Sequence, residues 1–254
     1  MQPIDLNADV GESFGAWQMG ADAELLAFVT SVNVACGFHA GDPQVMDRTV
    51  GLAVRAGVAV GAHPGYPDLR GFGRRALAAE PAEVEADVLY QVGALAVFAS
   101  AHGTRLHHVK PHGALYNQAA VDPALARAIA RGVARASQEL VLVGLAGSRA
   151  MREAAASQGL RFAAEAFVDR RYLADGTLQS RRLPGSVLSD PAAAAAQAVR
   201  LVREGVVETA DGKEVAVEAE TFCLHGDQPA ALAVARAVRA ALEDAGVTVQ
   251  PLGA

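Results

Sequence analysis

The sequence predicts an α/β fold, and a (β/α) barrel fits it best. A recurring order supports this: a helical pattern ends, a glycine follows, and a short apolar strand begins. It occurs in "RAGVAVGAH" (55–63), "AHGTRLHHVK" (102–110), "SQGLRFAAEAF" (158–167) and "DAGVTVQPL" (244–252). Glycine just after a helix adopts the left-handed conformation without Cβ strain. Alternating helices and strands imply parallel strand pairing with right-handed crossovers.

Helix starts are marked as clearly as helix ends. An aspartate that can cap the helix precedes a proline in the first turn at Asp42-Pro43, Asp122-Pro123 and Asp190-Pro191. We therefore interpret Asp42 as a cap rather than a catalytic group.

Seven candidate strands follow from the apolar runs, at 4–8, 32–35, 58–62, 106–109, 140–145, 161–166 and 221–224. The segment 247–249 is a candidate eighth strand. Seven or eight such units predict an irregular barrel, with an open doubly wound sheet as the alternative. We expect a single domain over 1–254, with a polar insertion near 168–188 and a hairpin near 206–217 around Asp211-Gly212.

Composition narrows the function classes. The formal net charge is -6 and only two lysines occur, so a basic face for nucleic acid is not expected. No uncharged apolar run reaches the roughly 18–20 residues that span a bilayer, and the first residues do not resemble a signal peptide. Cys36 and Cys223 are far apart, and we expect reduced thiols and a cytoplasmic location.

Polar residues gather at the predicted carboxyl ends of the strands, which in a parallel barrel form one face where active sites are built. We predict catalytic roles for Asp9, Glu12, His63, Lys110, His112 and His225. We predict substrate binding by Asn7, Asn33, His39, Arg70, Arg74, Arg75, Glu165 and Asp227. Asp9 and Lys110 are expected to lie past the packed strand segments and to matter little for folding.

Structural roles compete with these predictions. His63 and His225 each follow an apolar strand and could be buried structural histidines, and the three arginines could be solvated. We interpret His107 and His108 as packing or surface residues. The sequence contains no G-x-x-x-x-G-K-[ST] phosphate loop and no H-E-x-x-H motif.

Six blocks of the sequence resemble the LamB/YcsF family in order over nearly the whole chain. They are "DLNADVGESFGAW", "VNVACGFHAGDP", "GAHPGYPDLRGFGRR", "VKPHGALYN", "EAFVDRRYLADGTLQSR" and "LHGD". The resemblance implies a distorted (β/α)7 barrel of the glycoside hydrolase/deacetylase type. It also implies the A subunit of an ATP-dependent 5-oxoprolinase, which opens 5-oxo-L-proline to L-glutamate together with the B and C subunits.

The residues suit that chemistry. Lys110 and the arginine loop could hold a carboxylate or phosphate, Asp9 or Glu12 could activate water, and a histidine could protonate the departing nitrogen. ATP, with Mg²⁺, is the expected co-substrate, and no tightly bound metal is expected. Two alternatives remain: a metal-dependent deacetylase or amidohydrolase with Asp9, His39 and His63 as ligands, and a non-catalytic substrate-binding subunit.

Overall fold

Seven parallel strands form a closed barrel in the computed structural model, which describes residues 3–224 and 230–252. The strands, in their order around the barrel, are β1 (Asp5–Val10), β2 (Ser31–Ala35), β3 (Ala59–His63), β4 (Leu106–Val109), β5 (Val141–Leu145), β6 (Phe162–Phe167) and β9 (Thr221–Leu224). β9 pairs with both β6 and β1 and so closes the barrel. The predicted barrel is confirmed, and the open sheet is wrong.

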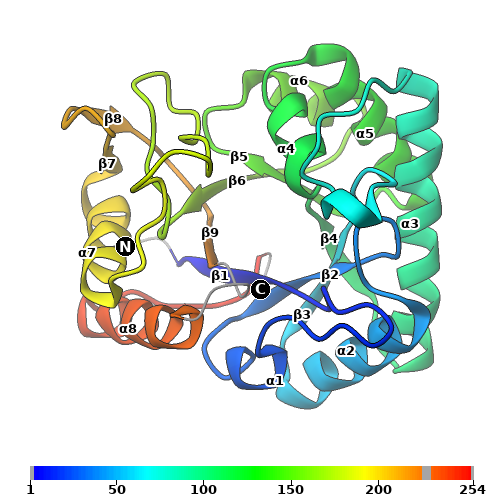
Figure 1. The fold of residues 1–254 in the computed structure, drawn as a ribbon, viewed down its shortest axis with the longest axis horizontal. Coiled ribbons are helices and arrows are strands. Elements are labelled where there is room, and N and C mark those ends of the chain that lie inside the picture. The colour runs from blue at the N-terminus through cyan, green and yellow to red at the C-terminus, as the bar shows by residue number, and fades with distance from the viewer. Residues whose placement is uncertain (1–2, 225–229, 253–254) are drawn as a thin grey trace.

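Helices surround the barrel, as Figure 1 shows. They are α1 (Asp22–Leu25), α2 (Pro43–Ala56), α3 (Pro81–Ala101), α4 (Gly113–Ala119), α5 (Pro123–Ala136), α6 (Arg149–Ser157), α7 (Pro191–Glu204) and α8 (Ala231–Asp244), with a 3-10 turn η1 (Leu69–Gly71). The side chains of Asp42, Asp122 and Asp190 accept backbone N–H groups at the starts of α2, α5 and α7, as predicted.

Two segments outside the barrel have different outcomes. The hairpin is confirmed, because β7 (Val206–Glu208) pairs antiparallel with β8 (Glu214–Ala216). The segment 247–249 is not an eighth barrel strand: it contributes one isolated bridge, between Val249 and Ile4. Seven strands already satisfy the pairing edges of β1 and β6, so no position in the barrel remains for it.

One helix meets the length and composition of a membrane span. Among the described residues, only α3 is long and apolar enough by those criteria, although it carries Glu83, Glu85 and Asp87. A core helix of a soluble protein passes the same test, and α3 packs against α5 and against β3 and β4 of the barrel.

The barrel interior is polar on the side of β1. Leu6, Ala8 and Val10 are buried in the apolar core, and the alternate residues face the other way. Asp5 accepts hydrogen bonds from the hydroxyls of Thr30, Ser31 and Thr221 at 2.5–2.8 Å. Aliphatic side chains usually fill such a barrel. Here a hydrogen-bonded network replaces them and supports the polar groups at the mouth.

Candidate functional site

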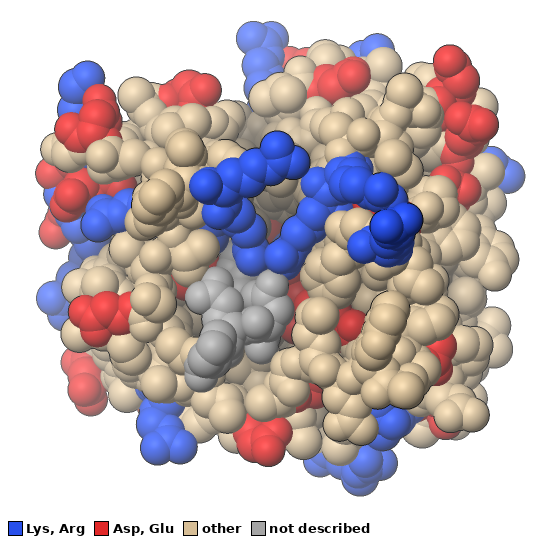
Figure 2. All heavy atoms as spheres, in the orientation of Figure 1, with Lys and Arg blue, Asp and Glu red and all other residues tan. Residues whose placement is uncertain are grey.

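A cavity of about 650 Å³ opens at the carboxyl ends of the strands. Its floor includes Asp9, His63, Lys110 and His112, and its wall includes Arg74, Arg75, Arg170, Arg181 and Arg182. Basic side chains border the central hollow on this face in Figure 2. Within the described part of the chain, the structure thus brings together six of the predicted site residues, from β1, β3 and the loops that follow β3 and β4.

Lys110 lies in the floor, within a network of oppositely charged groups. Its Nζ is 3.0 Å from Asp9 Oδ1, 2.9 Å from Glu165 Oε1 and 3.0 Å from Cys223 Sγ. Burial alone would lower the pKa of Lys110, but its interactions with Asp9, Cys223 and Glu165 outweigh burial and hold that pKa well above its usual value. The lysine is therefore a permanent cation.

The expected position of Asp9 is wrong, whereas Lys110 follows the last residue of β4 as expected but is buried. Asp9 lies within β1, paired with Asn33 of β2, and only 2% of Lys110 is exposed. Because β1 extends to Val10, two residues beyond the predicted end, the polar pair belongs to the packed barrel.

Asn33 and His108 hold Asp9 from the other side. Asn33 Nδ2 donates to Asp9 Oδ1 at 2.9 Å, and Asn33 Oδ1 lies 2.7 Å from His108 Nε2. Because an amide oxygen only accepts, His108 carries its proton on Nε2. Burial lowers the pKa of His108 to about 3, so the ring is neutral. The sequence interpretation missed this supporting role. A signal was Gly61 on β3, where a Cβ would lie 2.1 Å from His108 Nε2.

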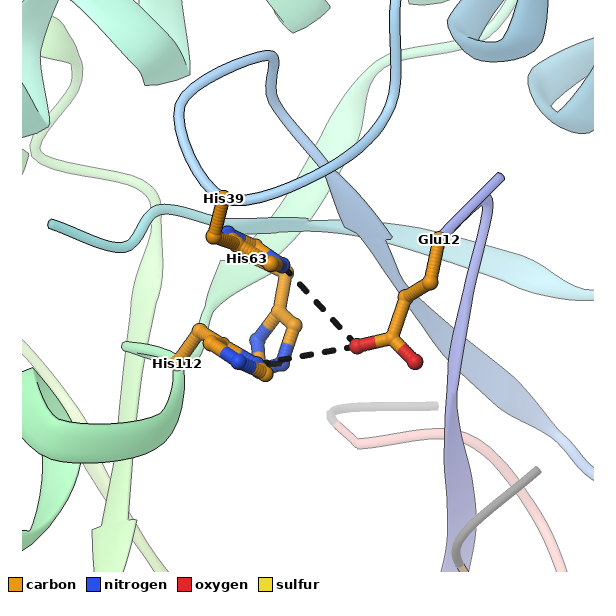
Figure 3. A group of neighbouring side chains, drawn as sticks. All are labelled: Glu12, His39, His63 and His112. Carbon is orange, nitrogen blue, oxygen red and sulfur yellow. Dashed lines mark hydrogen bonds and ion pairs between the residues drawn. The ribbon is translucent and has the colours of Figure 1, made fainter. Parts of the chain in front are cut away.

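Three histidines and a glutamate gather beside Asp9. His39, His63 and His112 follow or end β2, β3 and β4, and Glu12 follows β1, as Figure 3 shows. The Glu12 carboxylate points at the rings, with Oε1 3.6 Å from His112 Nδ1 and 3.9 Å from His39 Nε2. One ligand atom from each residue lies within 4.8 Å of the others. Burial lowers the pKa of His39 and of His112 well below the usual value. We call these four residues the histidine cluster.

Glycines make room for the histidine cluster. A Cβ on Gly73 would lie 2.8 Å from both His112 Cδ2 and His39 Cβ, and one on Gly65 would lie 2.7 Å from His39 Nδ1. Gly73 also has a φ of 61°, where other residues are strained. The stacked rings of His39 and His112, 3.8 Å apart, depend on this bare backbone.

Other predicted residues lie elsewhere. Arg70 is exposed and does not line the cavity, whereas Arg75 both lines it and pairs with the buried Asp68. Asn7 and Glu165 are buried under the floor and hydrogen-bonded to each other. His225 and Asp227 lie outside the described residues.

The insertion at 168–188 contributes arginines to which the sequence had assigned no site role. Arg170, Arg181 and Arg182 line the cavity opposite the 74–75 loop. The paired arginines in "DRRY" and "SRRL" were the available signal, but the sequence alone did not place the insertion over the barrel mouth.

Known proteins match this chain over nearly its full length. A family model described as "LamB/YcsF family" matches residues 4–254. Proteins named as the A subunit of 5-oxoprolinase, from Heliobacterium modesticaldum and Symbiobacterium thermophilum, are each 56% identical, covering 97% and 100% of this chain and 97% of each relative.

Solved structures agree with the barrel. The lactam utilization protein from Thermus thermophilus has a TM-score of 0.92 at 55% identity, over 98% of this chain and 99% of that one. A protein from Enterococcus faecalis has a TM-score of 0.54 at 14% identity, over 97% and 95% of the two chains, and shares the fold alone.

Proposed function

Because this chain belongs to the LamB/YcsF family, we propose that it is the A subunit of an ATP-dependent 5-oxoprolinase. It opens the lactam of 5-oxo-L-proline to L-glutamate, coupled to hydrolysis of ATP to ADP and phosphate. The observation that carries the proposal is 56% identity, over almost the full length of both chains, to relatives named as the A subunit of 5-oxoprolinase.

The cavity suits an anionic substrate. 5-Oxoproline carries one carboxylate, and a phosphorylated lactam oxygen would add further negative charge. Arg74 and Arg75 on one side and Arg181 and Arg182 on the other supply planar donors that match carboxylate and phosphate groups. These arginines support the assignment of this cavity as the substrate site.

Asp9 is the candidate base. Its Oδ1 is held by Lys110 and Asn33, and its Oδ2 faces the histidine cluster, 3.4 Å from His63 Nε2. The carboxylate takes a proton from water as the water oxygen attacks the lactam carbon. The carbon–nitrogen bond then breaks, and Asp9 returns the proton to the departing nitrogen.

Lys110 acts in this scheme as a positioning residue. Its ammonium already contacts two carboxylates beneath the floor, so it fixes Asp9 rather than receiving a new anion. The sequence hypothesis had placed an anionic intermediate on Lys110. The arginines around the cavity mouth are the better candidates for that role.

ATP coupling is assigned to the complex. The sequence has no recognisable phosphate loop, and the relatives are named as one subunit of a larger enzyme. We therefore place ATP, with Mg²⁺, in an assembly with the B and C subunits. There the γ-phosphoryl group is transferred to the lactam oxygen, so water attack and carbon–nitrogen cleavage give a γ-glutamyl phosphate. A second water then releases phosphate and leaves L-glutamate.

Reconstitution tests the proposal. Glutamate release from 5-oxoproline is measured with the B and C subunits, with and without this chain, and with and without ATP. We expect turnover only when all components are present, and little or none from this chain alone. ATP-independent release by the isolated chain, or undiminished release when it is omitted, would refute the proposal.

A further inference from the structure

His63 Nε2 and His112 Nδ1 face each other inside the histidine cluster. His63 Nδ1 lies 2.7 Å from the carbonyl oxygen of Lys110, and His112 Nε2 lies 2.9 Å from that of Phe72. A carbonyl oxygen only accepts, so each of these nitrogens carries the ring proton. The remaining nitrogens, His63 Nε2 and His112 Nδ1, then present lone pairs to each other at 2.9 Å.

Further acceptor atoms lie around the space between His63 Nε2 and His112 Nδ1. Asp9 Oδ2 is 3.4 Å from His63 Nε2, and Glu12 Oε1 is 3.6 Å from His112 Nδ1. His39 is fully buried, and neither of its ring nitrogens has a hydrogen-bond partner. Buried polar atoms without partners are costly and rare. A cation at the centre of the histidine cluster would be bound by His63 Nε2, His112 Nδ1, Glu12 Oε1 and one ring nitrogen of His39.

We propose that Glu12, His39, His63 and His112 bind a divalent transition metal of the Zn²⁺ class. Three imidazoles and one carboxylate suit Zn²⁺ and its neighbours, and a tetrahedral site with bonds of about 2.0–2.1 Å separates its ligand atoms by roughly 3.3 Å. Three of the six separations between the ligand atoms, 2.9, 3.6 and 3.9 Å, lie around that value, and all six are within 4.8 Å.

The surroundings of the rings support the metal. Metal-binding histidines usually donate their second ring N–H to a backbone carbonyl or a carboxylate, which fixes the tautomer. His63 and His112 both do so, through Lys110 and Phe72.

The ligand set differs from the one considered from the sequence. Asp9, His39 and His63 were the candidates there, with no tightly bound metal expected. The structure replaces Asp9 by Glu12 and adds His112, and it leaves Asp9 beside the cluster as the base. The histidines become ligands rather than proton donors to the departing nitrogen.

Metal binding by the full chain alone tests this inference, which does not depend on the substrate. Protein prepared without metal-affinity steps or chelators is analysed for metal content, then stripped and titrated with Zn²⁺, with Mg²⁺ as the comparison ion. We expect one Zn²⁺ per chain, a higher melting temperature with Zn²⁺, and no such effect of Mg²⁺.

Variants locate the ion. Glu12→Gln and His39→Gln should each weaken Zn²⁺ binding by about a hundredfold or more, on the scale of lost ligand interactions. His107→Gln, a half-buried histidine outside the cluster, is the matched control and should bind as the wild type does.

No saturable Zn²⁺ binding by the wild-type chain would overturn the inference, and His63 and His112 would then share a proton instead. Wild-type affinity in both folded ligand variants would also overturn it. Neither result would bear on whether the assembled complex releases glutamate.

Discussion

Asp9 combines a fixed geometry with access to the cavity. One carboxylate oxygen is held by an amide and an ammonium, and the residue lines the cavity floor. We expect Asp9→Asn to lower glutamate release by the assembled complex by about a hundredfold or more, the usual scale for a general base. The melting temperature should change little, because Lys110 keeps Glu165 as a partner.

The control for Asp9 is Asp47→Asn. Asp47 is an exposed partner of His102 and does not line the cavity, so its variant should keep normal turnover. Turnover close to wild type in a folded Asp9→Asn complex would remove Asp9 from the reaction.

Lys110 should matter for folding, contrary to the expectation from its sequence position. Lys110→Met would leave Asp9 and Glu165 buried without their cation, and losing one partner of a buried ion pair costs roughly 3–5 kcal/mol. Urea unfolding of Lys110→Met measures this loss. Lys213→Met, which removes an exposed lysine of the hairpin, should be nearly neutral. Equal stability of the two variants would contradict the network described above.

At the scale of the elements, Asp5 ties three strands together through hydroxyls of Thr30, Ser31 and Thr221. Burial, the largest cause, raises the pKa of Asp5 to about 6, although these hydroxyls oppose the shift. The native barrel thus retains a proton that the unfolded chain releases above its ordinary pKa near 3.8. The stabilisation from this retained proton is complete below pH 3.8 and is lost as the pH rises through about 6.

The measurement compares wild type with Asp5→Asn by urea unfolding between pH 4 and pH 7. The free energy of unfolding of the wild type, relative to the variant, should fall by up to about 3 kcal/mol with rising pH. Asp211→Asn is the control, because the Thr209 hydroxyl lowers the pKa of Asp211 to about 2 and no such fall should occur. A difference that is flat across this range would show that Asp5 is ionised in the native barrel.

The contact between β3 and β4 requires a glycine at position 61, because the His108 ring occupies the space of a side chain there. A Cβ on Gly61 would overlap the His108 ring, so Gly61→Ala must displace the group that holds Asn33. We expect a loss of about 1–3 kcal/mol in unfolding free energy, typical of overpacking, and reduced turnover of the complex. Gly93→Ala, on an open face of α3, should instead be neutral or stabilising. Unchanged stability of Gly61→Ala would mean that the ring moves without cost.

At the scale of the whole molecule, two distant loops form the basic wall of the cavity. Arg74 follows β3, and Arg182 lies in the insertion that follows β6. We expect Arg74→Gln and Arg182→Gln each to raise the KM for 5-oxoproline by about tenfold or more, since each removes a charged donor for an anion.

Arg70→Gln is the matched control for the wall, because it changes the same loop as Arg74 outside the cavity. Its KM should equal that of the wild type. An equal rise in KM for Arg70→Gln and Arg74→Gln would mean that the overall positive charge of the loop attracts the substrate, rather than direct contact with Arg74.

The sequence by itself determined the barrel and the helix caps, because these depend on local patterns. It also determined the family, because six sequence blocks resemble the family in the same order along the chain. Periodicity and the Asp-Pro caps are short-range signals, so the seven barrel strands were placed to within two residues. The convergence of Asp9, His63 and Lys110 at one mouth followed from the rule for parallel strand ends.

The tertiary structure alone decided what each polar residue contacts. Closure of β9 on β1 buried Lys110 between two carboxylates, and the path of the 168–188 insertion brought unpredicted arginines to the cavity. The carbonyls of Lys110 and Phe72 determine which nitrogens of His63 and His112 carry protons. Such long-range contacts leave no periodic trace in the chain, because they depend on where distant backbone segments meet.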